Sequence, residues 1–123
     1  MNDGDALILL VEDEPDLGLV LQETIEEWDR RVVRVPSGAE AMRVLAQQPV
    51  RLVLLDWQLA DMSAAQLLDQ LRSEARPVPP VVLMTARQSS ALEIRWPEVV
   101  GMLQKPFDLA ELARVLEQHL PHR

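Results

Sequence analysis

Cysteine and tyrosine are absent from the sequence, and lysine occurs once, as Lys105, beside eleven arginines. Without cysteine the chain forms no disulfide and offers no thiolate as a metal ligand or nucleophile. Long apolar runs are also missing, since none approaches the roughly 20 residues that a membrane span requires. The segment from Met1 to Asp5 is acidic, unlike the basic start of a signal peptide. We therefore expect a cytoplasmic protein without membrane contact.

Positive charge is scarce as well. The chain has 20 acidic and 12 basic residues and a net charge of −8, which repels phosphate backbones and anionic membranes. We therefore expect no direct binding of nucleic acid by this chain. Its 123 residues, 48% of them apolar and 26% charged, are typical of one globular domain. We expect a single domain over residues 1–123 with its core at about residues 6–120.

Five short apolar runs predict five strands. Four of them are nearly continuous rather than alternating, which is typical of parallel strands that are covered by helices on both faces. The runs lie at residues 6–11, 32–35, 52–55, 81–84 and, more weakly, 99–103.

Helical patterns occupy the segments between these runs. The first helix is expected to start at Pro15, and its apolar residues from Leu17 to Trp28 form one stripe. The other helices are expected to start at Ser37, Ser63 and Asp108, with a short fourth helix at about Ser90 to Arg95. The alternation predicts a (βα)5 α/β fold, an open parallel sheet between two layers of helices.

Polar side chains follow four of the five strands. Glu12 and Asp13 follow the first, Asp56 the third, Thr85 the fourth and Lys105 the fifth. Because ligands of open α/β sheets bind outside the carboxyl ends of the strands, we expect these side chains to meet at one edge. Each of them alone is readily explained as a helix cap, a turn residue or a solvated charge, but their coincidence favours a site.

Three carboxylates at one edge require a positive partner. Two of them about 4 Å apart repel by roughly 4 kcal/mol at an effective dielectric constant near 20. Lys105 supplies one charge, but carboxylate and carbonyl oxygens are also the ligands that Mg²⁺ or Mn²⁺ prefers. With a divalent ion in place, Asp56 becomes a candidate nucleophile that forms an acyl phosphate.

Other marked residues are given ordinary roles. We expect Arg30 and Arg31 to lie in a solvated turn between a helix and a strand. We expect His119 and His122 to be exposed near the C-terminus rather than to bind a metal.

The sequence resembles the receiver domain of bacterial two-component response regulators from about Leu7 to Leu120. The motifs that carry the resemblance are LLVEDEP at 9–15, LVLLD at 52–56, VLMTA at 82–86 and KPF at 105–107. Their order and spacing make it specific. The resemblance implies a doubly wound, flavodoxin-like sheet with strand order 2-1-3-4-5.

The resemblance also implies the roles of the site residues. Asp56 would be the phosphoacceptor, Thr85 the switch hydroxyl and Lys105 the ammonium that binds a phosphoryl oxygen. Mg²⁺, with Mn²⁺ as an alternative, would be held by Glu12, Asp13, Asp56 and the backbone carbonyl of Gln58. The family further implies a cis peptide bond before Pro106. The phosphoryl donor would be a histidine kinase or a phosphotransfer protein, and phosphorylation would switch interactions with a downstream protein or fused module.

The sequence departs from the family pattern at positions that, in the family, pass the effect of phosphorylation on to a partner, which we call the readout. Ala60 and Ala64 stand where the family usually has proline and glycine, and Met102 stands at the place of the aromatic switch residue. The short fourth helix is a further departure. We therefore expect complete phosphorylation chemistry with an altered readout.

Two other functions remain open from the sequence. A magnesium-dependent aspartyl phosphatase would use the same residue types, but its two aspartates usually stand two positions apart after the first strand. A degenerate receiver that serves only for docking would fit the altered readout but not the intact site. A flavin-binding sheet is disfavoured because its phosphate would face Glu12 and Asp13. We expect the chain to be a stand-alone protein or an excised module. We do not expect an enzyme with substrate turnover. Its oligomeric state stays open.

Overall fold

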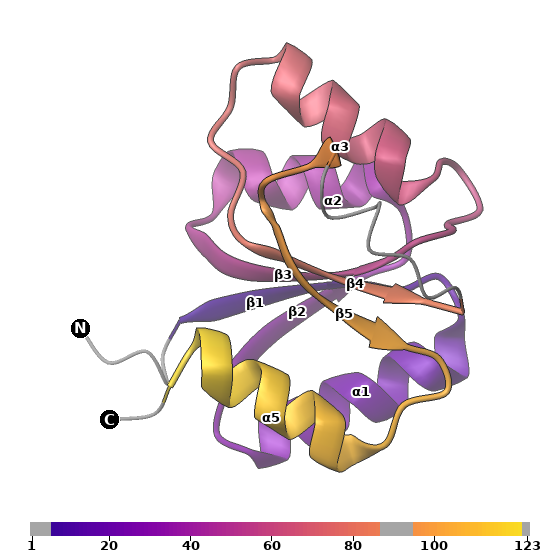
Figure 1. Cartoon of the computed structure of the whole chain (residues 1–123), viewed down its shortest axis with the longest axis vertical. Coiled ribbons are helices and arrows are strands. Elements are labelled where there is room, and N and C mark those ends of the chain that lie inside the picture. Colours follow the sequence, from indigo (N-terminus) through magenta and orange to yellow (C-terminus); the bar gives the residue numbers. More distant parts are fainter. Residues whose placement is uncertain (1–5, 87–94, 122–123) are drawn as a thin grey trace.

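In the computed structural model, which describes residues 6–86 and 95–121, one five-stranded sheet lies between two pairs of helices (Figure 1). The elements are β1 (Leu7–Val11), α1 (Pro15–Glu27), β2 (Arg31–Val35), α2 (Gly38–Gln47), β3 (Val50–Asp56), α3 (Ala64–Ser73), β4 (Val81–Thr85), β5 (Val99–Gln104) and α5 (Leu109–His119). The strand order is β2-β1-β3-β4-β5, and every neighbouring pair is parallel. The predicted fold class and strand order are confirmed.

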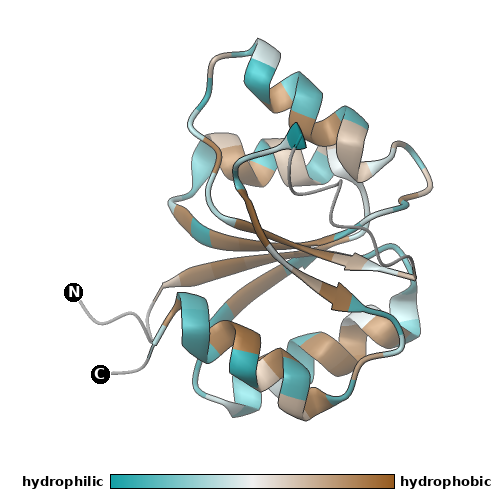
Figure 2. Ribbon diagram, viewed as in Figure 1, coloured by the Kyte–Doolittle hydropathy of each residue, from teal (hydrophilic) through white to brown (hydrophobic). Residues whose placement is uncertain are grey.

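The sheet separates two apolar cores. Side chains of a strand alternate between its faces, so Leu9 and Leu55 pack with α2 and α3, whereas Leu10 and Leu54 pack with α1 and α5. Figure 1 shows the two helix pairs on opposite faces, and Figure 2 shows apolar strands between helices that carry both hydrophilic and apolar residues. All four of these leucines are fully buried, as the nearly continuous apolar runs predict.

The helices begin where the sequence predicts. Pro15 stands in the first turn of α1, and the Ser37, Ser63 and Asp108 side chains accept backbone N–H groups at the starts of α2, α3 and α5. Such caps satisfy N–H groups that have no partner within the helix. The short fourth helix expected at Ser90 to Arg95 falls almost entirely outside the described residues. No helix in the described part of the chain combines the length and apolarity needed to cross a bilayer.

The expectation that Arg30 lies in a solvated turn is wrong. Its residue is only 5% exposed, and its Nη1 donates to the carbonyl oxygen of Leu120 at 2.7 Å. Its Nη2 donates to Oε2 of Glu117 at 3.0 Å. The turn after α1 packs against the end of α5, so the guanidinium is buried but hydrogen-bonded, which keeps its burial tolerable. Arg31, in contrast, is exposed as expected, although it is the first residue of β2 rather than part of a turn.

The structure tests the expected exposure of only one of the two C-terminal histidines. His119 is half-buried in the last turn of α5, beside Gly101 of β5, rather than exposed. His122 lies outside the described residues, so its expected exposure stays a prediction.

Candidate functional site

The predicted site residues meet at one edge of the sheet. Glu12 directly follows β1, Asp56 ends β3, Thr85 ends β4 and Lys105 directly follows β5. Because the strands are parallel, their carboxyl ends share one edge, on the right in Figure 1. Four segments that are far apart in the sequence thus deliver their polar residues to one place.

Three carboxylates form the acidic part of the site. Glu12, Asp13 and Asp56 each offer an oxygen, and these oxygens lie within 4.8 Å of one another. Glu12 is 1% exposed and Asp56 8% exposed, whereas Asp13 is half-buried. Carboxylates held this close and this far from water repel strongly unless a cation lies among them. The donor set, hard oxygens only, fits Mg²⁺ or Mn²⁺.

Lys105 contacts two of these acids. Its Nζ lies 3.0 Å from Oε1 of Glu12 and 3.4 Å from Oδ2 of Asp56. Burial lowers the pKa of Lys105, but the hydrogen bond and charge of Glu12 and the charge of Asp56 outweigh it, so the net pKa is raised. The ammonium therefore keeps its charge beside the acids.

Glu12 is the most buried acid of the site. Burial raises its pKa, and the hydrogen bond from Lys105 opposes the shift without cancelling it. The backbone N–H of Glu14 donates to its Oε2 at 3.2 Å. One lysine therefore does not compensate the desolvated carboxylate fully, which leaves the acidic group suited to a further positive charge.

A cavity of about 430 Å³ opens beside Asp56 and Lys105. Its lining is formed by Asp56, Trp57, Gln58, Thr85, Ala86 and Lys105. Thr85 is buried, and its carbonyl oxygen accepts the N–H of Lys105 at 2.8 Å. The cavity brings together the carboxylate, hydroxyl and ammonium that the sequence predicts to act on one group.

Gln58 lies in the same lining, two residues after Asp56. Its backbone N–H approaches Oδ1 of Asp56 at 3.5 Å. The peptide bond between Lys105 and Pro106 is cis, as the resemblance implies.

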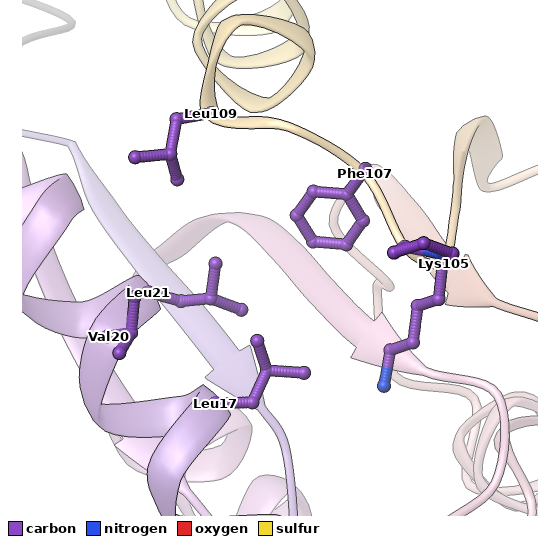
Figure 3. A pocket seen from close by; sticks show the side chains of 7 residues that line it. Leu17, Val20, Leu21, Lys105, Phe107 and Leu109 are labelled. Atoms are coloured by element: carbon purple, nitrogen blue, oxygen red, sulfur yellow. The ribbon is translucent and has the colours of Figure 1, made fainter.

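An apolar groove of about 370 Å³ adjoins the site and shares Lys105 with it. Figure 3 shows Leu17, Val20 and Leu21 of α1 on one side and Phe107 and Leu109 on the other. Val20 and Leu109 are 54% and 46% exposed, although both are large apolar residues. The groove therefore presents an apolar surface directly beside the reactive edge.

Sequence reasoning missed one residue that contacts the site and one in the loop that follows Asp56. Nη2 of Arg34, in β2, donates to the carbonyl oxygen of Glu12 at 3.1 Å. Gly18 in α1 leaves room for this side chain, because a Cβ there would collide with the Arg34 guanidinium. The second missed residue is Asp61, whose carboxylate binds the start of α2. Neither contact has a local sequence signal, since the partners are backbone groups or residues distant in the chain.

The family model for the response regulator receiver domain matches residues 8–117. The transcriptional regulatory protein GlrR of Escherichia coli (strain K12) is 32% identical over 122 residues, covering 98% of this chain and 27% of that protein. The chain thus spans little more than a quarter of that relative's length.

Solved structures show the same similarity. The non-phosphorylated HemR receiver domain from Leptospira biflexa is 29% identical, with a TM-score of 0.82 over 97% of both chains. The receiver domain of the sensor histidine kinase PA1611 from Pseudomonas aeruginosa PAO1, solved with a magnesium ion in its active site cleft, is 27% identical. It has a TM-score of 0.80 and covers 94% of this chain and 98% of that one. The chain belongs to the family of response regulator receiver domains of two-component systems.

Proposed function

We propose that this chain is a phosphoacceptor in two-component, or phosphorelay, signal transduction, and that Asp56 receives the phosphoryl group. The observation that carries this proposal is the ammonium of Lys105 at 3.0 Å from Glu12 and 3.4 Å from Asp56, beside an acidic group suited to a divalent ion. Such a combination neutralises a transferring phosphoryl group.

The metal would be held by Glu12, Asp13, Asp56 and the backbone carbonyl of Gln58. The close carboxylate oxygens of the three acids support this ligand set, and Gln58 lines the cavity beside Asp56. A bound Mg²⁺ or Mn²⁺ would supply positive charge to the phosphoryl oxygens. Glu12 and Asp13 would bind the metal ion and fix its position. Asp56 would bind it as well and is the only one of the three acids that also reacts with the phosphoryl group.

The reaction proposed for Asp56 is a displacement at phosphorus. A carboxylate oxygen of Asp56 forms a bond to the phosphorus of a phosphohistidine, and the bond from phosphorus to the histidine nitrogen breaks. That nitrogen keeps the electron pair and takes a proton from water. Lys105 binds a phosphoryl oxygen, and the Thr85 hydroxyl donates to another. The chain assists its own phosphorylation and slow dephosphorylation, and it is not an enzyme with substrate turnover.

The phosphoryl donor proposed here is a histidine kinase or a phosphotransfer protein. A protein donor has to bring its phosphohistidine to the cavity, so the donor needs a surface of this chain to bind beside the cavity. The apolar groove between α1 and the start of α5 supports such a donor, because it ends at Lys105. Phosphorylation would then change interactions with a downstream protein or module. We propose that residues 6–120 act as one receiver unit in the cytoplasm.

The test is incubation with acetyl phosphate and Mg²⁺, followed by intact-mass measurement. We expect the wild-type chain to gain the mass of one phosphoryl group, and Asp56→Asn to gain none. Omitting Mg²⁺ or adding EDTA should abolish the gain in the wild type.

The matched control is Asp29→Asn. Asp29 is exposed and has a φ of 59°, a conformation that asparagine tolerates. This variant should gain mass like the wild type. An unmodified wild-type chain, or equal modification of Asp56→Asn, would refute the proposal.

A further inference from the structure

The loop between β3 and α3, residues 57–63, carries Gln58 beside the site and contains neither proline nor glycine. Its position is therefore set by its contacts rather than by a constrained backbone. One of these contacts joins Asp61 to the start of α2. Its Oδ1 accepts the N–H of Gly38 at 3.0 Å, and its Oδ2 accepts the N–H of Ala39 at 3.1 Å.

Both oxygens of Asp61 are thus bound to the first turn of α2. The first N–H groups of a helix lack partners within the helix, and a negative charge there is favoured by the helix dipole. The hydrogen bond from Gly38 is the main reason that the pKa of Asp61 is lowered. The carboxylate therefore stays charged and bound at neutral pH.

A second contact seats the loop on the same helix end. The Met62 side chain occupies the space that a Cβ on Gly38 would need. Gly38 thus permits the loop to lie directly on α2. Asp61 and Met62, which are adjacent in the loop, both contact the start of this helix. Ser37, in contrast, caps α2 from within its own segment by accepting the N–H of Glu40 at 3.2 Å.

Backbone contacts inside the loop connect this attachment to Gln58. The N–H of Leu59 donates to the carbonyl oxygen of Met62 at 3.1 Å, and Gln58 forms an antiparallel bridge with Ser63. The start of the loop is held separately, since the N–H of Trp57 donates to the carbonyl oxygen of Met84 at 2.9 Å, so the Asp61 attachment acts on Gln58 from the C-terminal side of the loop. Asp56 is less affected, because it ends β3 and pairs with Met84 of β4.

We propose that Asp61 is a positioning residue for the divalent ion, acting by attaching the β3–α3 loop to α2 and so fixing the Gln58 carbonyl at the site. This inference rests on the proposed function, since that function supplies the metal and the role of Gln58. Loss of Asp61 should weaken metal binding while leaving Asp56 able to react.

The experiment compares Mg²⁺ titrations of the wild type and Asp61→Ala, followed by tryptophan emission, to which Trp57 contributes from the cavity lining. We expect the Kd for Mg²⁺ to rise about 10-fold in Asp61→Ala, the lower end of the effect of residues that orient metal ligands. At saturating Mg²⁺, acetyl phosphate should modify both proteins to the same extent. At low Mg²⁺, Asp61→Ala should be modified less.

Ser37→Ala is the matched control. It removes a cap from the same end of α2 and should lower the thermal midpoint by a similar amount, but it leaves the loop attached. Its Kd for Mg²⁺ should equal that of the wild type. Asp61→Asn keeps one acceptor oxygen, so its Kd should lie between those of the wild type and Asp61→Ala.

Two failures are distinguishable. If Asp61→Ala and Ser37→Ala bind Mg²⁺ equally well, the inference is overturned while the proposed function stands. If the wild type binds Mg²⁺ but is never phosphorylated, the proposed function fails while the Mg²⁺ affinities still decide the role of Asp61. A wild type that binds no Mg²⁺ overturns both.

Discussion

Two ion pairs join distant parts of this chain, and they differ in which partner is buried. At the site, the buried partner is an acid: the Glu12 side chain is 1% exposed, and that of Lys105 is 24% exposed. At the end of α5 the buried partner is a cation: the Arg30 side chain is 2% exposed, and that of Glu117 is 56% exposed. The two pairs have nearly equal lengths, each 3.0 Å from N to O.

The two pairs differ in the other groups that contact the buried charge. Arg30 also donates to the Leu120 carbonyl oxygen at 2.7 Å, so its burial links the turn after α1 to α5. Glu12 has Asp56 as a close like charge, which raises its pKa further. Removing one partner of a buried, hydrogen-bonded charge pair is strongly destabilising, whereas a buried charge beside a like charge is typical of a functional site.

The largest effect is expected from removing the buried cation. Arg30→Met should lower the free energy of unfolding by about 2 kcal/mol, because the Leu120 carbonyl loses a charged donor and stays buried. Urea denaturation in EDTA measures this loss. Phosphorylation of Asp56 under native conditions should be unchanged, since Arg30 is not among the residues that line the site cavity.

Arg31→Met is the control for this change. Arg31 is the exposed neighbour in sequence, and its replacement should alter the stability much less. A loss of less than half a kilocalorie per mole in Arg30→Met would show that its buried hydrogen bonds add little.

A smaller effect of opposite sign is expected from removing the buried acid. Glu12→Gln should raise the free energy of unfolding at pH 7 in EDTA, because it removes a desolvated charge whose pKa is raised by burial. An acid with a raised folded-state pKa contributes stability below its usual value of 4.5, and this contribution is lost as the pH rises through the folded-state pKa. The advantage of the variant should therefore be absent at low pH and grow toward neutrality.

Urea denaturation over a pH series measures this trend, and Glu14→Gln is its control. Glu14 is exposed and adjoins the same acids, so its replacement should give no such pH-dependent gain. Saturating Mg²⁺ should reverse the order of wild type and Glu12→Gln, because metal binding stabilises the folded state that binds it. Equal stability at every pH would contradict the role given to burial.

The smallest effect is expected from the exposed acid of the second pair. Glu117→Gln should change the free energy of unfolding by less than about 0.5 kcal/mol, since the Glu117 side chain is 56% exposed and its charge is screened by water. Arg30 keeps its hydrogen bond to Leu120 in this variant. A loss as large as that of Arg30→Met, measured by the same denaturation, would show that the acid rather than the carbonyl anchors the arginine.

The fold and the acidic edge were accessible from sequence for one physical reason. Apolar runs mark parallel strands, and parallel strands bring the residues at their carboxyl ends together, so Glu12, Asp56, Thr85 and Lys105 could be grouped without coordinates. The caps at Ser37 and Ser63 were equally accessible, because a capping side chain acts within three residues of itself.

The contacts of Arg30 and Asp61 were not accessible in this way. Arg30 binds groups 87 and 90 residues away, and one of them is a backbone carbonyl, which every residue carries. Asp61 binds backbone N–H groups 22 and 23 residues away. A single sequence holds no periodicity or spacing that selects such partners, so both side chains look like ordinary turn residues.

The close approach of Gly18 and Arg34 restricts the order in which this sequence can change. Any residue larger than glycine at position 18 would meet the Arg34 side chain, which holds the carbonyl oxygen of Glu12. A shorter residue at position 34 would remove this contact and so make a larger residue at position 18 easier to accept. The two positions are thus epistatic: a substitution that is harmful today becomes tolerable after another that lies on a different element.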